Sequence, residues 1–383
     1  MVCLENADGS NPNFNELRSL SLSAGAKVVF EVTAKIGALN SGYFVGSGKL
    51  QKIKELTKKH NISLIIFGEE LSPIQQRNLS IHLSCRVIDR VALILDIFAL
   101  RANSHEGKVQ VELAQLEYIS SKLVRGWTHL ERQKGGIGLR GPGETQLETD
   151  RRLIGIKVKK LKHQLVNLEK QRKNRRRARE RSGMPNVSLI GYTNAGKSSI
   201  FNALSKSKVF AANLLFATLD TTSRRVFLAE GKNMILSDTV GFINKLPHRL
   251  IEAFKATLQE TVDVDLLIHV IDYADENWRR HMDDVEIVLR EVKAEKVPRI
   301  NLFNKIDIKG LDPRVEHDQY GRISSVWASA KNKQGLNLLK QAVLSHVLYN
   351  IDVCVNKNVD SCMNLADFPD QYRNKPPSTE SLF

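Results

Sequence analysis

The chain has 383 residues, of which 42% are hydrophobic and 26% are charged, and its formal net charge is +15. This composition is that of a soluble globular protein with two or three domains, and it excludes a chain that is disordered throughout. The longest apolar stretch, Val91–Leu100, contains Asp96 and is too short to cross a bilayer, so we expect no stable membrane insertion.

The amino terminus and the cysteines indicate a cellular compartment. The first residues contain neither a basic start nor an apolar segment, which argues against a secretion signal. The four cysteines show no CxxC pair and no metal-ligand spacing, so we interpret them as reduced thiols. They are Cys3, Cys85, Cys354 and Cys362. We therefore expect a cytoplasmic protein.

The positive charge is concentrated in one segment. Residues 151–183 contain 14 basic side chains and only two acidic ones, so this segment carries +12 of the total charge. A basic surface indicates contact with nucleic acid or with an anionic membrane surface. We therefore assign the expected polyanionic partner to this segment and not to the chain as a whole.

Residues 1–105 are predicted to form an N-terminal α/β domain with a mostly parallel sheet. Short apolar runs alternate there with helical patterns, as they do in βαβ units. The predicted strands are Val28–Val32, Leu64–Phe67 and Arg86–Asp89, and the predicted helices are Lys49–Lys59 and Leu71–Leu83.

Residues 106–183 are predicted to form an antiparallel coiled-coil hairpin, because two heptad tracks flank a segment that no helix can continue through. That segment, Lys134–Gly143, contains five glycines and a proline. The first track is Val109, Leu113, Leu116, Ser120, Leu123, Trp127 and Leu130, and the second is Leu147, Ile154, Val158, Leu161, Leu165 and Leu168. The second helix continues into the basic run and stops before Pro185.

Residues 184–349 are predicted to form a third domain with a mostly parallel sheet flanked by helices, which makes the whole chain an α/β protein. Residues 350–383 are a short polar tail that we expect to be disordered. The predicted strands are Val187–Ile190, Arg225–Leu228, Met234–Ser237, Leu266–Ile271, Ile300–Phe303 and Ser325–Ala328, and two of the predicted helices are Ser198–Leu204 and Asn277–Val292.

The third domain begins with a phosphate-binding motif. A GxxxxGK[ST] sequence follows an apolar strand and opens a helix, which is the context that a P-loop requires. Its backbone N–H groups are expected to bind the α- and β-phosphates, Lys197 the β- and γ-phosphate oxygens, and the Ser198 hydroxyl Mg²⁺. The residues concerned are Gly191, Tyr192, Thr193, Asn194, Ala195, Gly196, Lys197, Ser198 and Ser199.

A second phosphate motif lies about 40 residues after the P-loop, at the end of a predicted strand. It is the tetrapeptide Asp238, Thr239, Val240 and Gly241. We expect Asp238 to hold Mg²⁺ through water and the Gly241 N–H to meet the γ-phosphate. An Asp-x-x-Gly sequence is also a common turn, so its position after a strand and after the P-loop is what favours the functional interpretation.

Two further loops select the base. Asp307, in the sequence Asn304-Lys305-Ile306-Asp307, can accept hydrogen bonds from guanine N1 and N2, a donor pair that adenine lacks. Asn304 can tie this loop to the P-loop, and the Lys305 side chain can cover the base. The backbone of Ser329, Ala330 and Lys331 is expected near guanine O6. The sequence therefore predicts GTP as the ligand.

The order of these motifs resembles that of the translation-factor-like GTPases, and the segments before them are similar to the signature of the HflX family. The resemblance covers roughly residues 25–348. The segments that carry it are Tyr43–Lys49, Val87–Arg90, Val124–Glu131, Gly135–Arg152, Leu215–Asp220 and Phe254–Thr261.

This resemblance implies further expectations. Thr218 would be the switch I threonine that closes on Mg²⁺ and the γ-phosphate, and Lys197, Thr218 and Gly241 would form the catalytic set. The protein would be a monomeric cytoplasmic GTPase of the stress response that binds the large (50S) ribosomal subunit and its rRNA through the glycine-rich tip and the basic helix, and that splits stalled or idle ribosomes. Two departures are a threonine, Thr221, where the family usually has proline, and a carboxyl-terminal segment unlike the small domain that often follows.

One catalytic group is missing from the pattern. In Ras-like enzymes a glutamine after the Asp-x-x-Gly glycine orients the attacking water. Here that position is Phe242, which can neither donate nor accept a hydrogen bond. We therefore expect slow intrinsic hydrolysis and a partner that completes the site.

Three alternatives remain open on the sequence alone. The first is an RNA-stimulated, NTP-dependent RNA remodeller. The second is a nucleotide-dependent ribosome-binding module without significant turnover. The third is peripheral attachment to a membrane through the basic helix, whose apolar face is already committed to a heptad partner.

Overall fold

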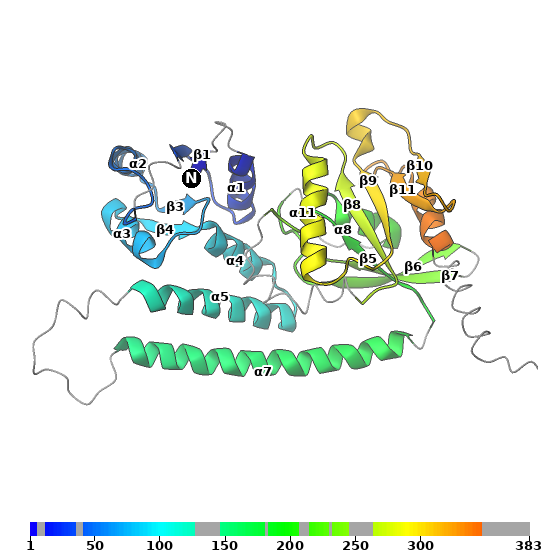
Figure 1. The fold of residues 1–383 in the computed structure, drawn as a ribbon, viewed down its shortest axis with the longest axis horizontal. Coiled ribbons are helices and arrows are strands. Elements are labelled where there is room, and N and C mark those ends of the chain that lie inside the picture. Colours follow the sequence, from blue (N-terminus) through cyan, green and yellow to red (C-terminus); the bar gives the residue numbers. More distant parts are fainter. Residues whose placement is uncertain are drawn as a thin grey trace, which may run out of the picture.

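The computed structural model describes residues 1–5, 12–35, 41–126, 146–180, 183–206, 214–229, 232–244 and 263–346. Figure 1 shows two α/β units side by side and, along one edge of the molecule, a pair of long helices. The α/β architecture with mostly parallel sheets agrees with the prediction from sequence. In the described part of the chain, no helix is both long enough and apolar enough to span a bilayer.

The N-terminal unit is built on a four-stranded sheet in the order β2-β1-β3-β4, with every neighbouring pair parallel. The strands are β1 (Val2–Glu5), β2 (Val32–Lys35), β3 (Leu64–Phe67) and β4 (Arg86–Asp89). The predicted strand over Val28–Val32 is wrong, because pairing with β1 places Val32 opposite Val2 and the strand continues from there to Lys35. Strand β1 itself was not predicted from the sequence.

Four helices cover this sheet: α1 (Pro12–Ser23), α2 (Ser47–Lys59), α3 (Pro73–Leu83) and α4 (Arg90–Arg101). Local sequence fixes two of their starts. Ser72 and Gln75 form a reciprocal capping box at α3, and the Asp89 carboxylate accepts a hydrogen bond from the Ala92 N–H at α4. Six residues of α4 are buried, so this helix lies inside the molecule and not on its surface.

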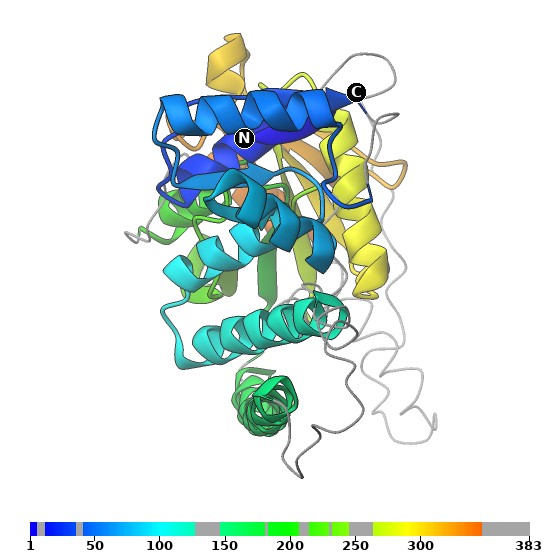
Figure 2. The same cartoon turned by 90° about the vertical axis from the view of Figure 1, so that its left-hand side faces the viewer.

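The helical hairpin consists of α5 (His105–Gly126) and α7 (Gln146–Glu180), which lie side by side in both views (Figures 1 and 2). Val109 and Leu113 of α5 form a small core with Leu161 of α7, so these members of the two predicted heptad tracks do meet. Ion pairs link Lys157 to Glu112 and Lys162 to Glu117 across the seam. Trp127, Leu130 and the glycine-rich tip lie outside the described residues.

The hairpin also packs on the N-terminal unit, through a second face of α5. Val111 and Ala114, on a second face of α5, are buried in the core that also contains α1 and α4. The helix therefore packs on the N-terminal unit along one face and on α7 along another. Figure 2 shows α7 as the outermost element on this side of the molecule.

The carboxyl-terminal unit contains a seven-stranded sheet in the order β10-β11-β9-β8-β5-β7-β6. Only the edge pairs β6–β7 and β10–β11 are antiparallel. The strands are β5 (Asn186–Ile190), β6 (Thr222–Ala229), β7 (Lys232–Asp238), β8 (Leu266–Asp272), β9 (Arg299–Asn304), β10 (Val315–His317) and β11 (Ile323–Trp327). The labelled helices and the short 3-10 turn are α8 (Lys197–Ser205), α11 (Trp278–Glu291) and η2 (Ile306–Lys309), and residues 336–346 are also helical. All six predicted strands are present, and β10 was not foreseen.

The two α/β units share a hydrophobic core. Phe98 and Leu20 of the N-terminal unit are buried in the same cluster as Leu215, Phe216 and Val240 of the carboxyl-terminal unit. These last three residues belong to the predicted switch region and the second phosphate motif. The N-terminal unit thus packs directly on the segments that we expect to respond to the nucleotide.

Candidate functional site

The P-loop runs from the carboxyl end of β5, an interior strand of the seven-stranded sheet, into α8. Two of its glycines have positive φ angles, +145° at Gly191 and +96° at Gly196. A Cβ atom at Gly196 would lie 2.2 Å from Asn304 Nδ2, and one at Gly191 would lie 2.2 Å from the Val270 carbonyl oxygen. Glycine is therefore required at both positions, for backbone conformation and for close packing.

Lys197 is buried at the start of α8, and its ammonium group donates to the carbonyl oxygens of Gly191 (3.1 Å) and Tyr192 (2.8 Å). Burial lowers the pKa of this lysine to about 8, and the nearby Asp238 carboxylate acts in the opposite direction. A cation that is poorly compensated by its surroundings is well suited to bind phosphate oxygens.

Ser198, Thr218 and Asp238 converge beside this lysine. Ser198 Oγ donates to Asp238 Oδ2 over 2.7 Å, Thr218 Oγ1 lies 3.1 Å from the same oxygen, and the two hydroxyl oxygens are 2.8 Å apart. Asp238 is fully buried, and burial raises the pKa of its carboxyl group. These are the three residues predicted from sequence as the metal-binding set.

The donor set fits a magnesium ion. Oxygen ligands are those that Mg²⁺ prefers, and it is usually held by one or two carboxylates together with substrate phosphates and water. Asp238 Oδ1 is buried without a hydrogen-bond partner among the described residues. No cluster of three or more His, Cys, Asp or Glu side chains that could hold a metal occurs in the described ranges, so phosphate oxygens would have to complete the coordination.

A cavity of about 230 Å³ is lined by the P-loop and switch residues. Gly241 forms part of its wall so closely that a Cβ atom there would lie 2.8 Å from Thr193 Cγ2 and 2.9 Å from Lys197 Nζ. The Thr239 hydroxyl donates to the Leu189 carbonyl oxygen over 2.6 Å, which fixes the motif against β5. The cavity lining also includes Ser199.

The base-binding loop is tied to the P-loop by a side chain. Asn304 Nδ2 donates to the Ala195 carbonyl oxygen over 2.9 Å, and Asn304 Oδ1 accepts from the Ala330 N–H over 3.0 Å. The Ser329 hydroxyl donates to Asp307 Oδ1 over 2.6 Å. Asn304 thus joins its own loop to the P-loop and to the loop that contains Ala330. Ser329, in this last loop, orients the Asp307 carboxylate.

Lys305 and Lys331 lie on either side of this arrangement. Lys305 has a positive φ of +65° and donates to Asp272 Oδ2 over 2.7 Å, an ion pair that the sequence analysis did not foresee. Lys331 is exposed. Asp272 is the last residue of β8, so it could have been suspected as another charged residue at the carboxyl edge of the sheet.

Tyr192 and Val240 contribute differently from the other motif residues. The Tyr192 side chain leaves the phosphate cavity, stacks on His281 with a centroid distance of 3.9 Å and donates to Glu16 Oε2 over 2.9 Å. Val240 is buried in the core between the two units. Neither residue lines the phosphate cavity.

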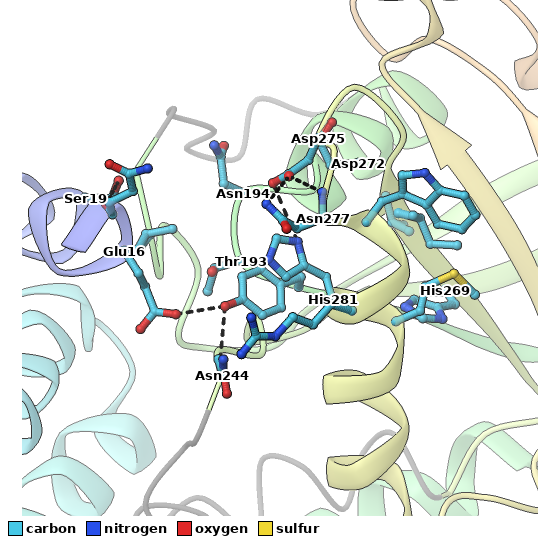
Figure 3. A pocket seen from close by; sticks show the side chains of 18 residues that line it. Glu16, Ser19, Thr193, Asn194, Asn244, His269, Asp272, Asp275, Asn277 and His281 are labelled. Carbon is cyan, nitrogen blue, oxygen red and sulfur yellow. Dashed lines mark hydrogen bonds and ion pairs between the residues drawn. The ribbon is translucent and has the colours of Figure 1, made fainter. Parts of the chain in front are cut away.

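A second cavity, of about 360 Å³, separates α1 from the P-loop and α11. Figure 3 shows Glu16 reaching into it from α1, opposite His281, with Asn244 at one end. The Tyr192 hydroxyl accepts from the Asn244 N–H over 3.1 Å, and Arg90 pairs with Glu16 over 2.6 Å. Sequence reasoning missed Glu16, Arg90 and Asn244, because their roles depend on contacts between units.

Phe242 points away from the phosphate cavity. Its side chain is 1% exposed and belongs to a core cluster with Ile190, Leu267 and Val285. Its backbone forms a bridge with the P-loop, because the Thr193 N–H donates to the Phe242 carbonyl oxygen and the Phe242 N–H to that of Gly191. The residue has a structural role that a glutamine could not fill.

Comparisons with known proteins agree with this geometry. Three family descriptions match consecutive parts of the chain: "GTP-binding GTPase N-terminal" over residues 11–99, "GTP-binding GTPase Middle Region" over residues 101–179, and "50S ribosome-binding GTPase" over residues 186–305. The last of these spans the P-loop and the Asp-x-x-Gly motif and ends at Lys305.

Individual relatives cover nearly the same range. The chain is 50% identical over 337 residues to a protein named GTPase HflX from Escherichia coli (strain K12), covering 88% of this chain and 79% of that one. It is 43% identical over 343 residues to the protein of the same name from Caldanaerobacter subterraneus subsp. tengcongensis, covering 90% and 79%. A solved structure, the complex of SsGBP with GDP, matches with a TM-score of 0.52 at 25% identity over 91% of this chain and 98% of that one.

Proposed function

The chain belongs to the HflX family of GTPases, and from this premise we propose that it is a GTP-driven factor that binds the large (50S) ribosomal subunit and splits stalled or idle ribosomes. The observation that carries the proposal is the convergence of Ser198, Thr218 and Asp238 beside Lys197, with Asn304 tying the base loop to the P-loop. Such an arrangement suits a nucleoside triphosphate and favours guanine.

In this proposal the phosphates lie in the cavity of the P-loop, with Lys197 on the β- and γ-phosphate oxygens and the Gly241 N–H on the γ-phosphate. Ser198 and Thr218 would bind Mg²⁺ directly and Asp238 would bind it through water. The metal would neutralise charge on the phosphate oxygens. Asp307 would accept from guanine, while Ser329 orients its carboxylate.

Intrinsic hydrolysis is proposed to be slow. The Phe242 side chain is committed to the core, and no glutamine lines the phosphate cavity among the described residues. A Ras-type site without an activator turns over at roughly 10⁻⁴ per second, and activators add about 10³ to 10⁵. The description of the matching family, 50S ribosome-binding GTPase, supports the ribosome as the activator.

The exposed side of α7 is the proposed RNA contact. Lys159, Lys160 and Lys170 are exposed there and pair with no acidic group in the described ranges. In contrast, Lys157 and Lys162 face acidic residues of α5. Basic side chains in a row along an outer helix can neutralise successive phosphates of an RNA backbone.

The test is GTP hydrolysis and subunit dissociation measured with purified ribosomes at two salt concentrations. We expect 50S subunits to stimulate hydrolysis by at least about tenfold, and we expect binding to weaken steeply with salt while GDP affinity hardly changes. The double variant Lys159→Glu/Lys160→Glu should lose ribosome stimulation and keep basal hydrolysis. The matched control is Lys58→Glu/Lys59→Glu, another adjacent exposed pair, on α2.

Two results would overturn the proposal. Equal ribosome binding with GDP, GTP or no nucleotide, together with absent turnover, would indicate a binding module without an enzymatic cycle. Stimulation by free RNA equal to that by ribosomes, without subunit dissociation, would indicate an RNA remodeller.

A further inference from the structure

The described part of the switch I segment, residues 214–220, is held by the N-terminal unit. The Leu215 N–H donates to Ser23 Oγ of α1 over 2.9 Å. The Phe216 ring packs edge-on against Phe98 of α4, with ring centroids 4.8 Å apart and an interplanar angle of 83°. Leu215, Phe216 and Leu219 are all buried in the core that the two units share.

Phe216 shows that this docking determines the backbone conformation. Its φ angle is +56°, in the left-handed region that an aromatic residue rarely adopts. A conformation of this kind costs free energy and persists only where the surroundings enforce it. Here the surroundings are α4 and α1, because the Phe216 side chain is 2% exposed and lies among their residues.

Asp220 makes the most specific of these contacts, with the turn that begins α5. One carboxylate oxygen, Oδ2, accepts from the backbone N–H groups of Asn103 and Ser104, both over 2.7 Å. The other, Oδ1, accepts from the Ser104 hydroxyl over 2.5 Å. Ser104 Oγ in turn accepts from the Gly107 N–H over 2.9 Å, as the cap of α5. An anionic group at this position is also favoured by the helix dipole.

Gly107 makes this contact possible. A Cβ atom on Gly107 would lie 2.1 Å from Asp220 Oδ1 and 3.2 Å from Asp220 Cγ. A methyl group there cannot coexist with the observed position of the carboxylate. Glycine in the first turn of α5 is therefore explained by the approach of a switch I side chain from the other unit.

Thr218 lies between these anchors, with Phe216 two residues before it and Asp220 two residues after it. Its hydroxyl is the one that meets Ser198 and Asp238. A five-residue span fixed at both ends leaves the middle residue little freedom, so the anchors determine where the Thr218 hydroxyl lies.

We propose that Asp220 is a positioning residue of the GTPase reaction, which places Thr218 by binding switch I to the first turn of the hairpin helix α5. The inference rests on the proposed role of Thr218 toward Mg²⁺ and the γ-phosphate. Because the coupling is reciprocal in free energy, a γ-phosphate that orders Thr218 also stabilises the start of α5. Asp220 thereby links the nucleotide to the helix that carries α7.

The test uses Asp220→Ala and Gly107→Ala in the full chain. Asp220→Ala removes the carboxylate. Gly107→Ala displaces the same carboxylate by a clash from α5, and so leaves every residue of the carboxyl-terminal unit unchanged. Each should lower kcat by about tenfold or more, as small misplacements of a reacting group do. Each should also weaken binding of a non-hydrolysable GTP analogue with Mg²⁺ by about tenfold and leave GDP affinity unchanged within about twofold.

Combining the two changes makes the test specific. On the Asp220→Ala background the two contacts of the added methyl with the carboxylate are gone. Only Ser104 Oγ, at 3.0 Å, remains close, and this hydroxyl is no longer held by Asp220, so we expect no further loss. The matched controls are Gly155→Ala, a helical glycine of α7 whose Cβ would meet nothing within 4 Å, and Asp312→Ala, an exposed aspartate that does not line the phosphate cavity. Both controls should behave as the unsubstituted protein does.

Three results would overturn the inference while leaving the GTP site intact: unchanged kcat and analogue affinity, a parallel fall in GDP affinity that indicates general destabilisation, or additive effects of the two changes. Failure of the unsubstituted protein to bind guanine nucleotides would instead overturn the proposed function, and the inference with it.

Discussion

The hydroxyl of Tyr192 donates to the carboxylate of Glu16 over 2.9 Å and so joins the P-loop to helix α1. The Tyr192 hydroxyl oxygen also accepts a hydrogen bond from the N–H of Asn244, which lies just after the second phosphate motif. Burial and the adjacent Glu16 carboxylate raise the pKa of Tyr192 well above its usual range, so the phenol remains protonated and keeps donating. Arg90 compensates the charge of Glu16 from the other side.

Substitution Tyr192→Phe should therefore loosen the junction between the two units. It leaves the Asn244 N–H without its partner and removes one hydrogen bond from Glu16, which we expect to cost about 1 to 3 kcal/mol. Urea unfolding would measure the loss. Tyr320→Phe, at a side chain that is 72% exposed, is the control and should change stability by less than about 0.5 kcal/mol. Equal stability of the two variants would contradict the assigned role of the hydroxyl.

Introducing the Ras-like glutamine, Phe242→Gln, should not accelerate intrinsic GTP hydrolysis. The side chain points into the core beside Ile190 and Leu267, so an amide there would be buried without a partner, and the expected destabilisation is about 3 kcal/mol. Single-turnover hydrolysis and thermal unfolding measure the two effects. Phe227→Gln, on an exposed position of β6, should leave both unchanged. A faster basal rate in the Phe242 variant would show that the residue can reach the phosphate cavity.

Nucleotide affinity should fall as the pH rises above 8. Burial holds the pKa of Lys197 at about 8, and bound phosphate would raise it, so binding at higher pH requires proton uptake. Between pH 8 and the bound-state pKa, we expect GDP affinity to fall by up to about tenfold per pH unit. Titration calorimetry at pH 8.5 in buffers of different ionisation enthalpy would detect the proton taken up.

Whereas nucleotide affinity is expected to fall with rising pH, the contribution of Lys197 to the stability of the nucleotide-free protein is expected to rise. Its folded-state pKa lies below the unfolded value of 10.5, so the unfolded chain binds more protons between pH 8 and 10.5. The contribution of Lys197 to stability therefore rises with pH in that window. Lys197→Arg, which does not titrate there, should abolish the pH dependence of both quantities. A variant that retains it would assign the titration to another group.

Asp307→Asn should change base selectivity from guanine toward xanthine. The Asp307 carboxylate, oriented by Ser329, is the proposed acceptor for guanine N1 and N2, and an amide presents a donor where the carboxylate accepts. Hydrogen-bonded selection of this kind discriminates by large factors, so we expect GTP affinity to fall by at least about 100-fold and XTP to compete. Competition binding with GTP, XTP and ATP measures it, with Asp312→Asn as the control. Unchanged preference for GTP would refute the base-loop assignment.

The elements that were predictable from sequence are those that local patterns determine. The strand before Gly191 is a continuous apolar run, and the glycines and Lys197 occupy fixed positions around phosphate, so β5, the P-loop and α8 appear within one residue of their predicted bounds. The same holds for β8 and β9, which are buried strands of a parallel sheet. In these elements the residues that make the sequence pattern are the same ones that the structure buries or places around the phosphate cavity.

Elements that depend on distant partners were not predictable. β1 is only four residues long and becomes a strand because β2 and β3 flank it, and the start of β2 at Val32 follows from its pairing with Val2. The heptad pattern identified the α7-facing residues of α5 but not Val111 and Ala114, which face the N-terminal unit. Asp220 and Ser104 are 116 residues apart, and no spacing rule connects an acidic residue to a turn in another unit.

The junction between α7 and β5 has a mechanical consequence. Only five residues separate Glu180, the end of α7, from Asn186, where β5 begins. The start of β5 is held on both sides, since the Ile235 N–H of β7 donates to the Pro185 carbonyl oxygen and the Asn186 N–H donates to Asp265, just before β8. The far end of β5 is Ile190, next to Gly191. A load applied along α7 would thus reach the sheet at the start of the interior strand β5, and the P-loop lies one strand length, about 17 Å, from that point.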